Sequence, residues 1–219
     1  MAIVSMRSKR RVLEIAVAAF LCFLAFLMQL LALNYFGIHG SICNLPLTLT
    51  IVWGLVFGSS MRNLTAVQLR KKSFREIFSH QLASGSHSAF LIGWLFSWLF
   101  NSIMPVYPVY FPLTGWISGY FCLRGLGQGN LLAIPMTFVL TIIAEALMSW
   151  ELYLLYLFFH QSAKPDEMIQ QFHMVFDHLN AFILPEALLN SIIAPFIYFP
   201  MRSWYDVVEG ERSSFSIDD

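Results

Sequence analysis

The sequence predicts an all-α membrane protein, a bundle of six transmembrane helices with both chain ends in the cytosol. Of its 219 residues, 58% are hydrophobic and 12% are charged, whereas a soluble domain has about 25% charged residues. Apolar runs long enough to cross a bilayer recur along the chain, and basic residues fall on one side of the resulting topology. The formal net charge is zero, so nothing indicates a nucleic-acid partner. One domain, residues 1–219, is the simplest interpretation.

The six spans follow from the apolar runs. The first run, from Val12 to Leu33, is longer than the apolar core of a signal peptide, and no small-residue cleavage site follows it. We therefore expect it to remain as an anchor. The spans lie at about 12–34, 44–61, 88–104, 107–123, 131–157 and 180–201.

The third and fourth spans are separated only by the stretch NSIMPVYPVYFP. Prolines in this stretch break a continuous helix, and its Tyr107 and Tyr110 are typical of a membrane interface. An alternative topology fuses or half-inserts these two spans.

The distribution of basic residues sets the orientation. With the N-terminus inside, the cytosolic segments hold 12 of the 13 lysines and arginines, and only Lys164 lies outside. Cytoplasmic loops carry such an excess in membrane proteins. The sequence therefore predicts an N-in, C-in protein.

The inner loop, residues 62–87, combines apolar residues at roughly helical spacing with the basic residues Arg70, Lys71, Lys72 and Arg75. This pattern indicates an amphipathic helix on an anionic inner leaflet; an ordinary basic cytoplasmic loop is the alternative. The outer loop, residues 158–178, has no assigned role. The polar tail, residues 203–219, is expected to be disordered.

Motifs for catalysis or cofactor binding were sought without success. The chain has no GxxxxGK loop and no HExxH sequence, and its histidines offer no third ligand for a metal. The three cysteines lack a CxxC spacing and are interpreted as packing residues. We therefore expect no enzyme activity, no cofactor and no metal site.

Small residues four apart predict close helix packing. The pairs are Gly54 with Gly58 and Gly115 with Gly119. Such spacing lets helix backbones approach closely. We expect contacts within the chain, although a partner helix would use the same pattern.

Polar residues inside the last two spans are the candidate functional residues. Thr137, Thr141, Glu145 and Ser149 recur every four residues, which places them on one helix face. Glu186 and Asn190 have the same spacing in the sixth span. At 1.5 Å per residue, both carboxyls lie about 9 Å from the outer side of a bilayer core of about 30 Å.

A charge at that depth is costly, so each carboxyl must be neutral, paired or beside water. We expect Glu145 and Glu186 to face the bundle interior. Two interpretations stay open: the cluster binds a ligand or partner, or it holds the helices together.

The segment LPEALLNSIIAPFIYFPMR resembles the last helix of the rod shape-determining protein MreD family, and NLPLTLTIVWGLVFG and GWISGYF are similar to its earlier helices. The pattern in the last helix is carried by Leu184, Pro185, Leu188, Leu189, Asn190, Ala194, Pro195, Tyr198 and Arg202. Pro185 suits the first turn of that helix and Pro195 should kink it. Pro200 is expected to end the span. A kinked helix with Glu186 and Asn190 on one face suits a partner's transmembrane segment.

The resemblance implies a six-helix bundle similar in fold to the substrate-binding components of energy-coupling vitamin transporters. It also implies a non-enzymatic scaffold in the bacterial plasma membrane. Such a scaffold links an MreC-like protein, an MreB-like filament and a peptidoglycan glycosyltransferase and transpeptidase during cell-wall elongation. The alternative function is a vitamin-type transporter substrate-binding component, which shares the six-helix plan.

Overall fold

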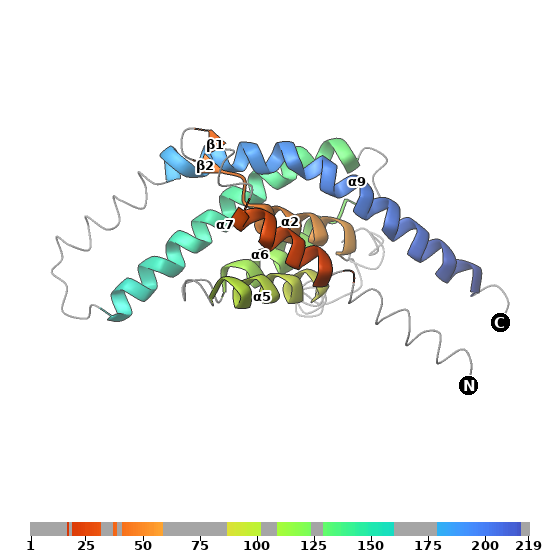
Figure 1. Cartoon of the computed structure of the whole chain (residues 1–219), viewed down its shortest axis with the longest axis horizontal. Helices are drawn as coiled ribbons and strands as arrows, with labels where there is room; N and C mark the ends of the chain where they lie inside the picture. The colour runs from red at the N-terminus through yellow and green to blue at the C-terminus, as the bar shows by residue number, and fades with distance from the viewer. Residues whose placement is uncertain are drawn as a thin grey trace, which may run out of the picture.

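The computed structural model of the chain describes residues 17, 19–31, 37–38, 41–58, 87–101, 109–123, 129–159 and 179–215. Over these residues the fold is helical apart from one small hairpin, so the all-α prediction is confirmed. The described helices are an N-terminal helix (Ala19–Leu31), α2 (Leu45–Phe57), α5 (His87–Asn101), α6 (Tyr110–Ser118), α7 (Gly129–Phe159) and α9 (Leu184–Phe215) (Figure 1).

Short elements adjoin three of these helices. A 3-10 turn, η3 (Gly119–Phe121), follows α6, and a π-helical turn, η4 (Leu179–Ile183), precedes α9. Strands β1 (Gly37–Ile38) and β2 (Ser41–Ile42) pair antiparallel just before α2. The sequence analysis did not predict this hairpin, which is two residues long on each side. The Ser41 hydroxyl holds it against η4 by donating to the Phe182 carbonyl at 3.0 Å.

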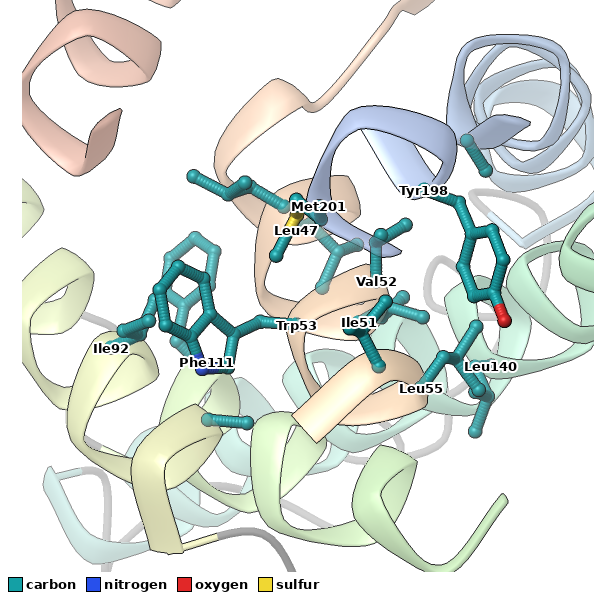
Figure 2. Close-up of a cluster of buried hydrophobic side chains, with 14 of the residues drawn as sticks. Leu47, Ile51, Val52, Trp53, Leu55, Ile92, Phe111, Leu140, Tyr198 and Met201 are labelled. Atoms are coloured by element: carbon teal, nitrogen blue, oxygen red, sulfur yellow. The ribbon is translucent and has the colours of Figure 1, made fainter. Parts of the chain in front are cut away.

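Helix α2 forms the centre of the bundle and packs against α5, α6, α7 and α9. Its residues Pro46–Val56 are all buried, as expected for a helix enclosed by protein on every side. The helix starts after Asn44, whose Oδ1 accepts from the Leu47 N–H at 3.2 Å. Figure 2 shows side chains of α2 meeting those of the surrounding helices, including Ile92, Phe111, Leu140, Tyr198 and Met201.

Helix α2 is shorter than the predicted span 44–61, of which residues 59–61 lie outside the described residues. It ends before Gly58, whose backbone is extended. Thirteen helical residues cover about 20 Å, against about 30 Å of hydrocarbon core. Near the end of α2, the Leu55 carbonyl accepts a hydrogen bond from another segment. The donor is the Leu123 N–H, at 2.9 Å.

The small-residue pairs lie at contacts within the chain. A Cβ added to Gly54 would overlap the Ser118 side chain, and one added to Gly58 would overlap the Gly119 backbone. A Cβ on Gly115 would overlap the backbone of Ala89 in α5. The glycines therefore let α2, α5 and α6 approach to backbone contact, as the spacing rule describes.

Helices α7 and α9 are the long elements of the bundle and pack extensively on each other. By length and composition, their segments Leu131–Tyr156 and Ala181–Asp206 could each cross a membrane. The N-terminal helix, α2 and α5 are apolar but shorter over the described residues.

The outward faces of α5, α7 and α9 carry large apolar side chains, and the inward faces of α7 and α9 carry several small and polar ones beside large side chains such as Leu140 and Tyr198. On α9, Leu188, Ile192 and Phe196 are exposed, while Ala187, Asn190, Ser191 and Ala194 are buried. On α7, Ile134, Val139, Ile143 and Trp150 are exposed, while Ala133, Thr137, Thr141 and Ala144 are buried. On α5, Trp94 and Trp98 are 57% and 62% exposed.

The end of α9 differs from the sequence expectation. Pro200 was expected to end the span and residues 203–219 to be disordered, but α9 contains Pro195 and Pro200 and continues through Phe215. Each proline removes one backbone donor, and packing against α7 and α2 supports the helix there. Beyond Pro200, Arg202 Nε donates to both carboxylate oxygens of Asp206 at 3.0 Å, an i, i+4 pair that supports a helix. Figure 1 shows α9 changing direction along its length.

Candidate functional site

The polar residues predicted on one face of the fifth span all point into the bundle. Thr137 and Thr141 are fully buried, Glu145 is 2% exposed and Ser149 is buried. They lie on α7 at intervals of four residues, so a single inward stripe contains them. The Thr137 hydroxyl has no hydrogen-bond partner among the described residues.

Glu145 is the centre of this stripe. Its Oε1 accepts a hydrogen bond of 2.6 Å from the Tyr110 hydroxyl of α6, which is short, as expected for a charge-assisted or strongly polar pair. Its carboxyl group also interacts with that of Glu186 on α9. The structure therefore brings together the two carboxyls that the sequence placed at one depth.

The Tyr110 side chain, predicted to suit a membrane interface, is buried in the bundle. It is 2% exposed, and its hydroxyl reaches Glu145. A phenol donor satisfies the buried carboxyl, which lipid could not do. Tyr107 lies outside the described residues.

Asn190 of α9 forms hydrogen bonds to α7 and to the two residues that precede α2. Its Oδ1 accepts from the Asn44 N–H at 2.9 Å and from the Cys43 thiol at 3.2 Å. Its Nδ2 donates to the Thr141 hydroxyl of α7 at 3.5 Å. One fully buried amide of α9 thus joins α7 to the residues that begin α2.

Cys43 stands at the junction between β2 and α2 and is 3% exposed. Burial raises the pKa of its thiol to about 12, the nearby Glu186 carboxyl adds to this rise, and a hydrogen bond with Thr48 opposes it. The side chain is therefore a thiol at neutral pH and can act as the donor to Asn190. All three cysteines are free and buried.

Glu186 lies next to Glu145, Asn44 and Asn190 and interacts with each of them. Its Oε1 is buried without a hydrogen-bond partner among the described residues. The carboxyl group of Glu186 therefore lies beside the residues that begin α2 and beside Glu145 of α7.

Glu151 is a functional residue that the sequence reasoning missed. It follows Glu145 by six residues on α7, off the stripe of four-residue intervals, and accepts from the backbone N–H groups of Val109 and Tyr110. The sequence contained one signal: no capping residue precedes α6, because its N-cap position is the apolar Val109. A helix start without a local cap needs an acceptor from elsewhere.

The remaining predicted residues are distributed as follows. Pro185 lies in the first turn of α9, as expected, and Pro195 lies within the helix. The predicted inner-leaflet basic residues lie outside the described residues: Arg70, Lys71, Lys72 and Arg75. The outer loop from residue 160 to 178 and the inner loop up to residue 86 also lie outside them. Among the described residues, no group of three histidine, cysteine or acidic side chains is arranged to hold a metal ion.

An apolar groove lies apart from the polar cluster, further along α9 toward its C-terminal half. It has a volume of about 460 Å³ and is open along one side. The N-terminal helix contributes Leu21 and Met28, α2 contributes Leu49, and α9 contributes Phe196 and Trp204. The groove and the polar cluster therefore use different lengths of α9.

Comparison with protein-family models, curated proteins and solved structures found no match to this chain. Function is therefore inferred from the residues themselves, from their arrangement in the bundle, and from the resemblance carried by the last helix.

Proposed function

We propose that this chain is a multi-pass protein of the bacterial plasma membrane, threaded six times with both ends in the cytosol. The observation that carries the membrane placement is the set of large apolar side chains on the outward faces of α5, α7 and α9. Trp94, Trp98, Trp150 and Phe196 are each more than half exposed there. Large exposed apolar surfaces on a protein mark contact with lipid or with a partner.

The inward faces support the same placement. Ala187, Asn190 and Ala194 line the side of α9 that packs in the bundle. Small residues at helix contacts and polar residues bonding across helices are typical of membrane bundles, where lipid removes the hydrophobic drive for helices to associate. The glycine contacts of α2 and α6 follow the same rule.

Within that membrane, we propose a non-enzymatic scaffold of the cell-wall elongation machinery. It would link an MreC-like protein, an MreB-like filament and a peptidoglycan glycosyltransferase and transpeptidase. The resemblance of α9 to the last helix of the MreD family supports this function. The hydrogen bonds of Asn190 and Glu145 also support it, since these groups are engaged in joining helices.

The partner surface is proposed to be the apolar groove. The sequence interpretation placed a partner against the face of Glu186 and Asn190, but those side chains face the interior. Further along α9, Phe196, Pro200 and Trp204 form one wall of the groove. We propose that the transmembrane segment of the MreC-like partner packs there.

A photo-crosslinker tests this surface. Placed at Phe196, which is 77% exposed in the groove wall, it should capture the MreC-like partner in cells. The matched control is Val139 on the outer face of α7, which is 50% exposed and should capture little. Capture of the partner from Val139 but not from Phe196 would overturn the proposed surface. Depletion that leaves cells rod-shaped would overturn the function itself.

Topology has its own test. Lys71→Cys in the inner loop should resist a membrane-impermeant thiol reagent in intact cells, whereas Lys164→Cys in the outer loop should react. The native cysteines give a low background because all three are buried. Labelling of Lys71→Cys in intact cells would contradict the N-in topology.

A further inference from the structure

The start of α6 lacks a cap of its own. Val109 occupies the N-cap position and makes no side-chain hydrogen bond to the helix. The first N–H groups of any helix have no partner within it. Pro112 removes one of these donors because it has no N–H. The N–H groups of Val109 and Tyr110 still need acceptors.

Glu151 of α7 supplies both acceptors. Its Oε1 lies 3.2 Å from the Val109 nitrogen, and its Oε2 lies 3.1 Å from the Tyr110 nitrogen. A carboxylate at a helix start is favourable because the helix dipole is positive there. The cap of α6 is therefore a side chain of another helix, and it fixes the distance between them.

Tyr110 is held to α7 at both ends. Its backbone N–H bonds Glu151, and its hydroxyl donates to Glu145. The two carboxyls differ in access to water: Glu145 is 2% exposed, whereas Glu151 is only partly buried. Glu151 is five residues from the end of the apolar segment at Tyr156, about 8 Å along the axis. Protons can reach it more readily than Glu145.

We propose that Glu151 is a pH-sensitive latch that holds the start of α6 on α7. As a carboxylate, it bonds both amides with the favourable charge. On protonation it loses that charge, the capping bonds weaken, and the two amides at the start of α6 are released, while the Tyr110 hydroxyl stays bonded to Glu145. With the proposed topology, this end of α7 faces the outside, so the latch responds to external pH.

The other titratable groups near the latch do not replace it. Tyr110 faces Glu151 from α6, Glu145 lies deeper on α7, and Glu186 of α9 interacts with Glu145. No basic side chain of the described residues acts on Glu151. Arg202 pairs with Asp206 in the second half of α9. The latch depends on the proposed bilayer placement and not on the proposed partner binding. The latch and the partner binding can therefore each fail without the other.

Hydrogen exchange of the full chain in lipid nanodiscs tests the latch. The amides of Val109 and Tyr110 report on it directly, because Glu151 is the acceptor found for each. At pH about 8 these amides should be protected from exchange. At pH about 4.5 their protection should fall by between about 2-fold and about 30-fold after correction for intrinsic exchange. This is the range for losing a helix N-cap. The Thr48 amide of α2, bonded to Asn44 at 2.9 Å, should not change.

Two variants complete the test. Glu151→Gln should show the weak protection at both pH values, and Asp206→Asn, which alters an exposed acid elsewhere, should keep the wild-type response. Wild-type protection that does not change with pH would overturn the latch without any variant. A pH response in Glu151→Gln equal to that of the wild type would also overturn it. A parallel loss at Thr48 would show general unfolding, which contradicts a local latch.

Discussion

Replacing Asn190 by alanine should destabilise the bundle more than any other single loss of a side-chain hydrogen bond near it. Asn190 accepts from the Asn44 N–H at 2.9 Å and from the Cys43 thiol at 3.2 Å, and donates to Thr141 at 3.5 Å. Alanine removes all three bonds at once. It also leaves the N–H of Asn44 without its acceptor at the start of α2.

The magnitude follows from these contacts. Leaving a buried backbone donor unsatisfied costs about 1–3 kcal/mol. Side-chain hydrogen bonds between membrane helices contribute about 0.6 kcal/mol on average and about 1.7 kcal/mol at most. The sum predicts a loss of about 2–4 kcal/mol in the free energy of unfolding, or about 30-fold to about 700-fold in the unfolding equilibrium.

The assay is reversible unfolding in mild detergent titrated with sodium dodecyl sulfate and followed by circular dichroism. Thr141→Val is the matched control, because it keeps the side-chain shape and removes only the 3.5 Å bond. It leaves the Asn190 Nδ2 donor without this acceptor but breaks only a long bond, so it should cost about 1 kcal/mol, the low end of the range for an unsatisfied buried donor. Equal losses in the two variants, or a loss below about 1 kcal/mol for Asn190→Ala, would refute the claim that Asn190 secures the start of α2.

Three further outcomes are expected. Gly54→Ala should destabilise the chain by about 1–3 kcal/mol through overpacking, measured in the same unfolding assay. Adding Ser118→Gly should recover only part of this loss, because the Gly119 nitrogen would remain 2.9 Å from the new Cβ. Tyr110→Phe should lower the free energy of unfolding by about 1–3 kcal/mol, since the Glu145 carboxyl loses its 2.6 Å donor; an unchanged value would show that this bond contributes little. Cys43 should react with maleimide only after unfolding, because the thiol is buried and its pKa is about 12; rapid labelling of the folded wild-type chain at pH about 8 would place it on an open surface.

Residue spacing was sufficient to predict much of the interior. The four-residue interval in α7 predicted the inward stripe of Thr141 and Glu145, because a helix has one geometry wherever it packs. The glycine pairs predicted close backbone contact for a similar reason. Both predictions needed only the helix itself and no knowledge of its neighbours.

Features that depend on neighbours were not accessible from spacing. The bond from Tyr110 to Glu145 was not predicted, because nothing local shows that Glu145 lies opposite its hydroxyl. The role of Glu151 was missed because its acceptor function belongs to a helix start about 40 positions earlier in the chain. Pro200 was expected to end α9, since local rules do not contain the packing on α7 and α2 that carries the helix through it.

Two polar residues of the long apolar helices, Asn190 and Glu151, share one physical role. The first N–H groups of a short helix have no partner within it, and lipid cannot supply one. Helix α2 begins beside Asn190, which lies nine residues, or about 14 Å, inside the apolar segment that starts at Ala181. Helix α6 begins at Glu151. An amide from α9 accepts for the first and a carboxylate from α7 for the second, so the polar groups stand at the depths where the short helices start.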